Sequence, residues 1–368
     1  MVFGKNDSVQ ATTALPQEVV DAVDLSDLKA FINTVDEDVQ RYLPRLDLKS
    51  WGITGPGWDL PKIGKALLEF FLREIIFNYK LMGQLVLLAM ALAILENMKH
   101  AFEEDNISRL AFSLCFLVVM GIVVNCFRIT FTIARGTITE MTNFMYAITP
   151  LLFSIVAAGG GAVTATIVHP LLISSVGLVG GLVSNLVFPL IMFTGILGMV
   201  NHLVESFQVN KLARLFKLAA NGILGVMMVV FIGLITLRGF TASVADSLTL
   251  RTAKYFSSAF LPVVGGAISD TMEMTAGCAA VLKGGLGVYG LGLITLLTIF
   301  PVLKILAVAV IFQMTGAVTQ PLGNNRLSDA LQTIGDAFFH LFGAVTVVGL
   351  MFFIALAILV GVANFGYI

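Results

Sequence analysis

The stretch FMYAITP at residues 144–150 recurs as FSSAFLP at residues 256–262, with Phe, Ala and Pro in the same three places. The dipeptide Phe188-Pro189 recurs as Phe300-Pro301 at the same offset. A fixed period of about 110 residues indicates a duplicated structural unit. Proline lacks an N–H group and its ring clashes with the preceding helical turn, so each copy is expected to break a helix. The sequence therefore predicts tandem repeat units with helix breaks at Pro150, Pro189, Pro262 and Pro301.

The composition is that of a membrane protein. Hydrophobic residues make up 57% of the 368 residues and charged residues 12%, about half the charged share of a soluble domain. Apolar runs reach the roughly 20 residues that cross a bilayer. The sequence predicts an all-α polytopic protein, in contact with the lipid bilayer, that crosses it roughly six to eight times. The apolar runs cover residues 81–95, 110–133, 141–158, 162–183, 185–204, 216–237, 286–316 and 341–363.

The repeat and the charge distribution together divide the chain. Residues 1–61 are acidic and are predicted to form a soluble, partly amphipathic helical region, with a degenerate half-repeat as one interpretation of it. Residues 62–140 are predicted to hold an amphipathic helix and a first transmembrane pair. Residues 141–256 and 257–368 are the second and third repeat units. Each unit is expected to contain two transmembrane helices and a Pro-broken re-entrant or interfacial helical hairpin.

Two segments leave alternatives open. Residues 62–80 alternate charged and apolar side chains at helical spacing, which fits either a helix on the membrane surface or a helix packed on protein. Residues 257–283 are too polar for a confident crossing and are expected to form the hairpin of the third unit. Basic residues divide almost evenly between the two ends of the predicted helices, so they do not fix the orientation in the membrane.

At three positions the third unit has ionisable residues where the second unit has Ala158, Gly161 and Met192. Ionisable groups at membrane depth cost a few kcal/mol and are candidates for function. They predict a polar path or an ion-pair pivot, while a structural salt bridge, or acids at the interface, would explain them equally simply. The candidate residues are Asp270, Glu273 and Lys304.

The sequence contains no pattern that would support an enzyme. There is no phosphate-binding G-x-x-x-x-G-K-[ST] loop and no H-E-x-x-H zinc motif. No Ser/His or paired-Asp arrangement for intramembrane hydrolysis stands out. We therefore expect no catalytic residues, no cofactor and no metal. The net charge of −1 gives no reason to expect a nucleic-acid partner.

Three stretches carry a family resemblance. The sequence from Ala245, ADSLTLRTAKYFSSAFLPVVG, is followed by IFPVLKILAVAVIF at 299–312 and QPLG at 320–323. Together they resemble the stage III sporulation protein AE family of endospore-forming bacteria, and the resemblance extends from about residue 17 to the C-terminus. It implies a multi-pass protein of the mother-cell membrane around the forespore, with the acidic N-terminal region between the two membranes.

The same resemblance implies a function and partners. The expected role is that of a non-enzymatic subunit of the secretion-like channel complex between mother cell and forespore, required for endospore development. The implied partners are other stage III sporulation membrane proteins, among them ring-forming subunits and a separate ATPase. A homo-oligomer is left open. The alternatives are a permease that moves a small solute through a polar path in the third unit, and an assembly platform that conducts nothing.

Overall fold

A computed structural model describes residues 24–44, 46, 57–99, 105–203, 209–260, 265–322 and 325–362. All regular structure over these residues is helical, as predicted for the fold class. The elements are α2 (Ser26–Thr34), α3 (Glu37–Gln40), α5 (Leu60–Phe77), α6 (Tyr79–Lys99), α7 (Asp105–Ala158), α8 (Ala162–Leu182), the π-turn η1 (Val183–Val187), α9 (Phe188–Leu203), α10 (Asn210–Phe260), α11 (Gly265–Thr319), the 3₁₀ turn η2 (Gln320–Leu322) and α12 (Asn325–Val362). In the described residues, α2, α3, α5 and α6 precede the helices of the main bundle.

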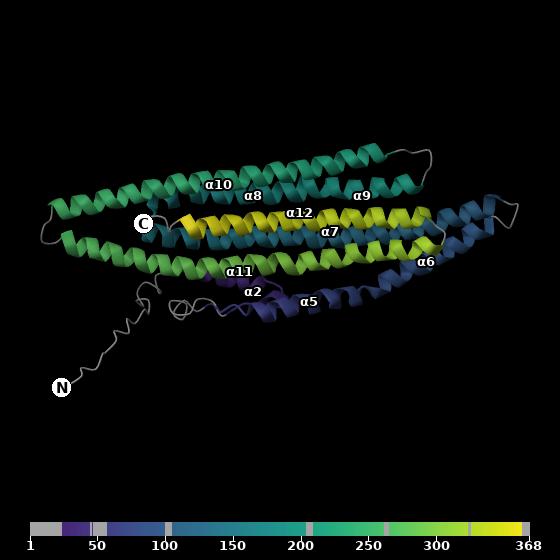
Figure 1. The fold of residues 1–368 in the computed structure, drawn as a ribbon, viewed down its shortest axis with the longest axis horizontal. Helices are drawn as coiled ribbons and strands as arrows, with labels where there is room; N and C mark the ends of the chain where they lie inside the picture. The colour runs from purple at the N-terminus through teal and green to yellow at the C-terminus, as the bar shows by residue number, and fades with distance from the viewer. Residues whose placement is uncertain are drawn as a thin grey trace, which may run out of the picture.

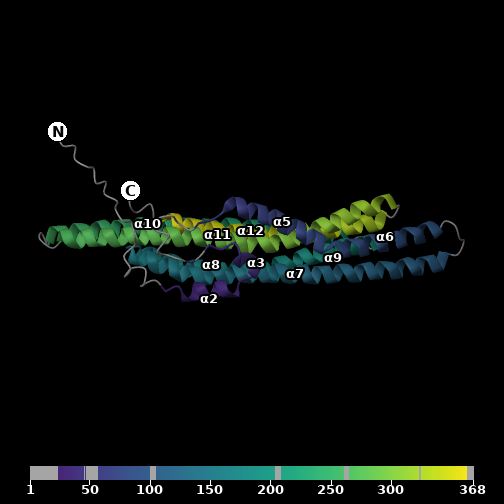
Figure 2. The same cartoon turned by 90° about the horizontal axis from the view of Figure 1, so that it is seen from below.

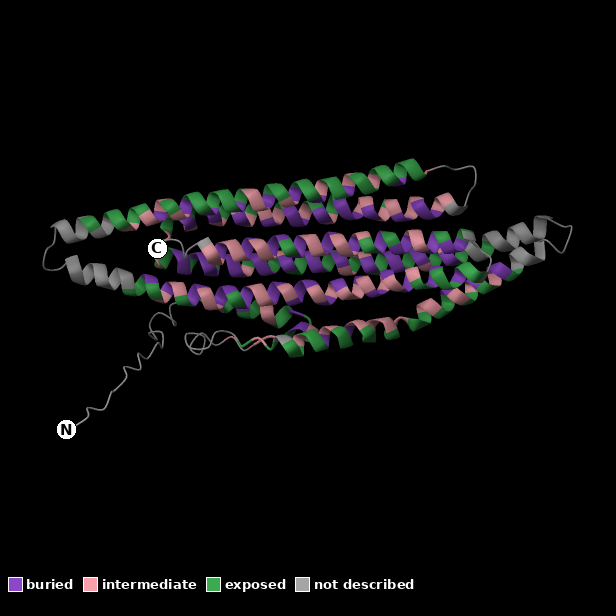
Figure 3. Ribbon diagram, in the orientation of Figure 1, coloured by how far each residue is buried: buried purple, intermediate pink, exposed green. Residues whose placement is uncertain are grey.

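The long helices lie side by side along one axis (Figure 1). Helix α12 packs on α11, α9, α10 and α7, and its side chains Phe338, Phe352 and Leu356 are fully buried. Glycines allow α11 and α12 to approach closely, because a Cβ on Gly287 would meet Val360. Buried positions run along α12 and α11, whereas α10 is exposed along most of its outer face (Figure 3).

Among the described residues, five helical stretches are long and apolar enough to cross a membrane, and a bent pair at Pro61–Phe77 and Tyr79–Ile94 would be a sixth. The protein is therefore a multi-pass helical membrane protein. Among the described residues this gives five or six stretches, at or below the low end of the roughly six to eight crossings predicted, because neighbouring apolar runs are joined: 110–133 and 141–158 both belong to α7. The five stretches are Leu117–Ala158, Ala162–Asn201, Asn210–Thr252, Met274–Thr319 and Arg326–Gly361.

These helices are longer than a bilayer requires. Helix α11 has 55 residues and spans about 80 Å at 1.5 Å per residue, whereas the hydrocarbon core is about 30 Å thick. Only part of each helix can lie in hydrocarbon. In α11, residues 284–303 carry no charge and are flanked by Lys283 and Lys304.

Helix α10 has a matching uncharged run at residues 218–237, flanked by Lys217 and Arg238. Each run holds about 20 residues and so measures about 30 Å, the thickness of the hydrocarbon core. The two runs lie beside the same part of α12. Phe231 of α10 lies 6.1 Å from Phe352 between ring centroids, and Thr298 of α11 lies against Gly349. We infer that this shared uncharged layer is the part of the bundle that lipid surrounds.

The helix breaks predicted at Pro150 and Pro301 are absent, because both prolines lie inside continuous α-helices. Each proline removes one backbone hydrogen bond, but tertiary packing of the flanking turns holds the helix. Ile148 and Leu152 are fully buried around the first proline, and Phe300 and Val302 are buried around the second.

The helix does change at Pro189. Residues Val183–Val187 form a π-turn, and the Phe188 N–H donates to the Val183 carbonyl oxygen, one residue further back than in an α-helix. The wider turn makes room for the proline ring without ending the rod. Pro262 lies outside the described residues.

The predicted re-entrant hairpin is also absent from the described part of the third unit. Residues 265–283 form the first turns of α11 and continue directly into its membrane-crossing stretch. The turn at 159–161 between α7 and α8 has its repeat counterpart at 271–273, inside α11. The boundaries predicted at residues 140 and 256 fall within α7 and α10. The tandem repeat stays a prediction.

Candidate functional site

Three consecutive glycines turn the chain from α7 into α8. The Gly160 N–H donates to the Ala157 carbonyl oxygen (3.1 Å), and the Gly161 N–H donates to that of Val156 (2.8 Å). This is the Schellman pattern, which needs a left-handed residue at its centre. Gly160 supplies it with a φ of +94°. A Cβ there would also meet the Leu250 side chain of α10, so the turn and α10 lie in direct contact.

Helix α8 begins without a capping side chain of its own, because its N-cap residue is Gly161. Asp246 of α10 supplies the missing acceptor. Its Oδ1 accepts from the Val163 N–H (2.8 Å) and its Oδ2 from the Thr164 N–H (3.0 Å). Asp246 is 6% exposed. A buried carboxylate at a helix N-terminus is stabilised by the free N–H groups and by the helix dipole, so this contact fixes α10 against α8.

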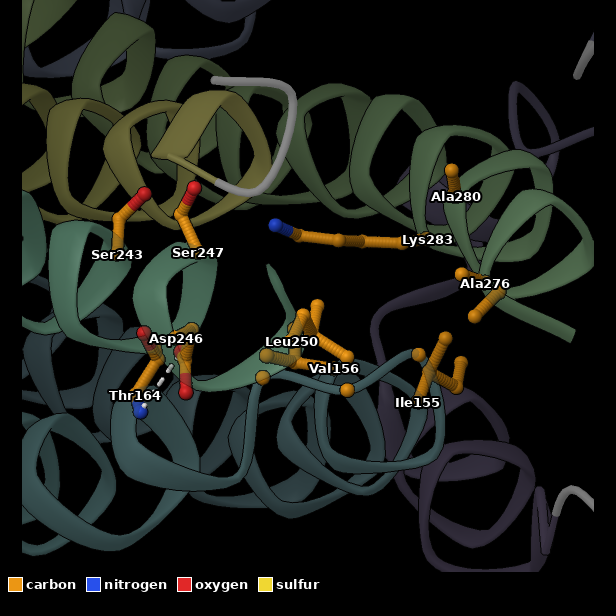
Figure 4. A pocket seen from close by; sticks show the side chains of 14 residues that line it. Ile155, Val156, Thr164, Ser243, Asp246, Ser247, Leu250, Ala276, Ala280 and Lys283 are labelled. Carbon is orange, nitrogen blue, oxygen red and sulfur yellow. Dashed lines mark hydrogen bonds between the residues drawn. The ribbon is translucent and has the colours of Figure 1, made fainter. Parts of the chain in front are cut away.

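A cavity of about 60 Å³ lies next to this cap, between α7, α8, α10 and α11 (Figure 4). Most of its wall is apolar, and its polar side chains come from α8, α10 and α11. The lining residues are Ile155, Val156, Gly159, Gly160, Gly161, Thr164, Ser243, Asp246, Ser247, Leu250, Ala276, Ala279, Ala280 and Lys283.

Lys283 is the charged residue that α11 brings to this cavity. It is 3% exposed. Figure 4 shows its side chain extending from α11 across the cavity toward Ser247 of α10. No ion pair or hydrogen bond joins the Lys283 amine to another residue of the described chain, including Asp246 on the facing helix. The cavity therefore combines apolar walls with one buried amine.

A second, wider cavity of about 320 Å³ lies at the opposite end of the uncharged layer, between α9, α10 and α12. Its polar residues include Arg214, Lys217, Asp336 and His340. Asp336 already accepts a hydrogen bond from the Gln313 amide (2.7 Å). Among the described residues, no three His, Cys, Asp or Glu side chains lie close enough together to hold a metal ion.

Of the three ionisable residues predicted as candidates, Lys304 is the one whose side chain the structure describes. Its Nζ lies 3.7 Å from Asp36 Oδ2 and 5.8 Å from the ring centroid of Phe70. The Lys304 side chain is 30% exposed and that of Asp36 is 55% exposed. The residue thus joins α11 to the N-terminal helices, as an ion-pair pivot or structural salt bridge would. Asp270 and Glu273 lie on the first turns of α11, and their side chains are outside the described residues.

The N-terminal helices α2, α3 and α5 form a layer on α7 and α11 (Figures 1 and 2). Phe300, from one of the repeated Phe-Pro dipeptides, is its main contact. Its ring lies 4.9 Å from that of Phe70 in an edge-on arrangement and 5.8 Å from that of Tyr42. Helix α5 therefore packs on protein, the second of the two alternatives for residues 62–80.

The first residues of α5 lie over the middle of the uncharged run of α11. Gly292 is needed there, since a Cβ would collide with the Trp58 ring. Trp58 lies on Gly292 and Phe70 on Phe300, so the intervening residues of α5 run beside residues 292–300 of α11. That segment of α5 carries three exposed charged residues on its outer side, Lys62, Lys65 and Glu69.

The sequence alone did not single out Asp246 or Lys283. Both lie in stretches whose charge spacing resembles an ordinary amphipathic or interfacial helix. One usable signal was the absence of a capping residue before Ala162, which requires an acceptor from elsewhere in the fold.

Comparison with known proteins gives the family. A profile of the stage III sporulation protein AE family matches residues 54–363. The chain belongs to that family. The stage III sporulation protein AE of Bacillus subtilis (strain 168) is 34% identical over 300 residues, which cover 82% of this chain and 75% of that protein. No solved structure matches the chain.

The stage III sporulation protein AE family is described by a stage of sporulation and not by a reaction. Its profile covers α5 to α12 almost completely and begins after α2 and α3. The bundle, the cavity at Lys283 and the contact between Phe300 and Phe70 thus all lie within the part of the chain that the family profile matches.

Proposed function

We propose that this protein is a non-enzymatic membrane subunit of the secretion-like channel complex between mother cell and forespore, where it works with other stage III sporulation membrane proteins. Ring-forming subunits and a separate ATPase are the partners we expect. The proposal places the chain in the mother-cell membrane around the forespore. Family membership supports the sporulation role.

One structural observation supports a place inside an assembly: the two faces of the bundle differ in chemistry. Helix α10 exposes only uncharged residues over 218–237, and Val229 is 74% exposed. Opposite this face, α5 exposes Lys65 and Glu69, whose side chains are 80% and 69% exposed. A charge at the centre of a bilayer costs on the order of 3 kcal/mol. The α10 face therefore suits lipid, while the α5 face suits water or another protein.

A channel subunit meets both requirements. Its outer face contacts lipid, and its inner face contacts either the water-filled path or a neighbouring subunit. A lone permease would hold its polar path between its own helices. Lys304, one of the residues expected along such a path, instead forms its ion pair with Asp36 in the outer N-terminal layer. This contact favours the channel subunit over the permease.

Photo-crosslinking in sporulating cells tests the proposal. A photoreactive amino acid is placed at Lys65 or Glu69 of α5, and at Val229 of α10 as the lipid-facing control. We expect the α5 positions to yield adducts with another stage III sporulation protein or a second copy of this chain, and the α10 position to yield lipid adducts. Lipid adducts at all three positions, together with normal endospores in cells that lack the chain, would contradict the proposal.

A second experiment separates the subunit from a permease. The variant Asp270→Asn, Glu273→Gln, Lys304→Met removes the three candidate charges. A channel subunit whose path lies outside its own bundle should still assemble with its partners and support endospore formation. Intact assembly with a complete loss of sporulation would favour the permease.

A further inference from the structure

The positive charge of Lys283 has no counterion among the described residues. The residue is 3% exposed, and its side chain makes no ion pair or hydrogen bond with another residue in the described part of the chain. A charged group removed from water costs several kcal/mol unless an opposite charge or strong acceptors replace the solvent. A lysine that is largely removed from water, lines a cavity and has no counterion among the described residues is therefore suited to bind an anion there.

Asp246 is the acidic residue that lines the cavity, and both its carboxylate oxygens already accept hydrogen bonds. Its two carboxylate oxygens accept the N–H groups of Val163 and Thr164. The N-terminal end of α8 offsets much of its negative charge. The carboxylate makes no ion pair with Lys283, so no described residue balances the positive charge of the lysine.

The cavity has the size of a small anionic group. About 60 Å³ corresponds to roughly four water-sized positions at about 15 Å³ each. A phosphate or carboxylate group fits such a space. The hydroxyl of Ser247 stands on the side of the cavity toward which the Lys283 side chain extends, and it can donate a second hydrogen bond (Figure 4). Val156, Leu250 and Ala280 form an apolar wall beside them.

The depth of the site also fits an anion of the membrane surface. Lys283 directly precedes the uncharged run 284–303, which matches the hydrocarbon thickness. Lipid phosphates lie just outside the hydrocarbon, in the headgroup layer. The amine is thus level with the phosphates of one leaflet, and the apolar wall can contact the adjoining part of an acyl chain.

We propose that the cavity between α7, α8, α10 and α11 binds one small oxyanion, with Lys283 as its charged ligand and Ser247 as a hydroxyl donor. The phosphodiester of an anionic phospholipid is one source of this group, and free phosphate is another. The proposal does not depend on the channel role, because a protein of any function could carry such a site.

Binding to the purified full-length chain tests the proposal. Phosphatidylglycerol is added in mixed micelles and counted by native mass spectrometry, with phosphatidylcholine as the zwitterionic comparison. Inorganic phosphate is measured separately by equilibrium dialysis. Charge-assisted hydrogen bonds contribute about 1.5–3 kcal/mol, so Lys283→Met is expected to weaken binding of the relevant probe by about tenfold or more. Lys217→Met removes a lysine from the other end of the uncharged layer and should change binding by less than about twofold.

A second variant keeps the lysine and fills the space. Ala280→Leu should weaken binding of the anion about as much as Lys283→Met does. It tests whether the anion binds in this cavity even if the lysine variant does not fold. Phosphatidylglycerol binding that free phosphate does not displace assigns the site to a lipid, and phosphate binding without lipid binding assigns it to a soluble anion. The proposal is overturned if wild type binds neither probe, or if both variants bind like wild type.

Discussion

At the scale of single residues, polar contacts decide how the apolar helices are placed. Packing alone leaves long apolar helices free to slide and rotate, because one apolar face resembles another. Asp246 removes that freedom for α10, since both its oxygens must meet the two N–H groups at the start of α8. Gly160 does the same for the turn that leads into α8.

Asp246→Ala should destabilise the protein by about 1–2 kcal/mol, because it leaves one buried and one partly buried N–H group without an acceptor. Thermal unfolding in detergent measures the loss. Hydrogen exchange should accelerate at the amides of Val163 and Thr164 in particular. Thr249→Ala is the matched control on the same helix, since the Thr249 hydroxyl bonds only to its own backbone at Ala245. Equal effects of the two substitutions would contradict the capping role.

Gly160→Ala should cost about 1–2 kcal/mol, because an L-residue is strained at a φ of +94° and its Cβ would meet Leu250. Gly181→Ala serves as the control. It lies within α8 with nothing near its Cβ position, so the higher helix propensity of alanine should stabilise the protein by up to about 1 kcal/mol. Relative to wild type, Gly160→Ala should lower the melting temperature and Gly181→Ala should raise it. If both substitutions shift the melting temperature in the same direction, the role given to Gly160 in the turn is refuted.

At the scale of elements, tertiary packing overrides the local effect of proline. The repeated Phe-Pro dipeptides were predicted to break helices. The helix nevertheless continues through Pro301, and at Pro189 it changes only by the π-turn that precedes the proline. In both dipeptides the phenylalanine is buried: Phe188 packs edge-on against Phe131, with centroids 5.7 Å apart, and Phe300 packs against Phe70. The dipeptide therefore marks a packing position in the middle of each rod.

Pro301→Ala tests whether α11 is one continuous helix. An interior proline disfavours a helix by about 3 kcal/mol, part of which the packing already offsets. If α11 is continuous, the substitution restores a backbone hydrogen bond and should raise the melting temperature. If residue 301 were a true helix break, alanine would impose the wrong geometry and lower it. Val302→Ala, at a buried neighbouring position, should lower the melting temperature and provides the comparison.

The ion pair between Lys304 and Asp36 joins the N-terminal layer to α11. Both side chains are partly exposed, so a double-mutant cycle with Lys304→Met and Asp36→Asn should give a coupling free energy of less than about 1 kcal/mol. Its effect should be local: limited proteolysis within residues 24–44 should become faster while the melting temperature of the bundle changes little. Global unfolding at lower temperature in either single variant would contradict a local role.

At the scale of the whole molecule, the bundle is longer than the membrane and has two unlike faces. The uncharged layer bounded by Lys217 and Arg238 on α10, and by Lys283 and Lys304 on α11, matches one bilayer. The remaining length of the helices must extend beyond the hydrocarbon. The charged outer side of α5 lies beside this layer, and the apolar face of α10 lies opposite it.

Spin labels along α10 should reveal this layer. In lipid vesicles, a label at Val229 should show the greatest contact with an apolar relaxing agent, and labels at Lys217 and Arg238 should show contact with water on opposite sides. The distance between those two positions is about 30 Å on a straight helix. A label at Lys65 of α5 should be accessible to water or protected by protein. Deep lipid contact at Lys65 would refute the two-faced arrangement.

Much of this architecture could be predicted from the sequence, and the errors have a common cause. Hydropathy indicated the helical membrane class because about 20 apolar residues in a row have few other uses. A hairpin was predicted at 257–283 from its polar residues, and a helix break was predicted at Pro301. The described part of both regions is continuous helix, because packing against neighbouring helices can stabilise a segment that would not be helical by itself. The candidate Lys304 was recognised by its charge, but its partner Asp36 lies far away in the sequence.

The sequence by itself determined that the chain is a multi-pass helical membrane protein of the stage III sporulation protein AE family, because composition, apolar run length and extended sequence similarity are properties of the chain alone. The tertiary structure decided the rest. It joined the apolar runs into long rods, laid the N-terminal helices over α7 and α11, and brought Asp246 to α8 and Lys283 to a cavity. The physical reason is that these outcomes depend on contacts between distant segments, where a cap, a counterion or a packing partner comes from another helix and leaves no local pattern.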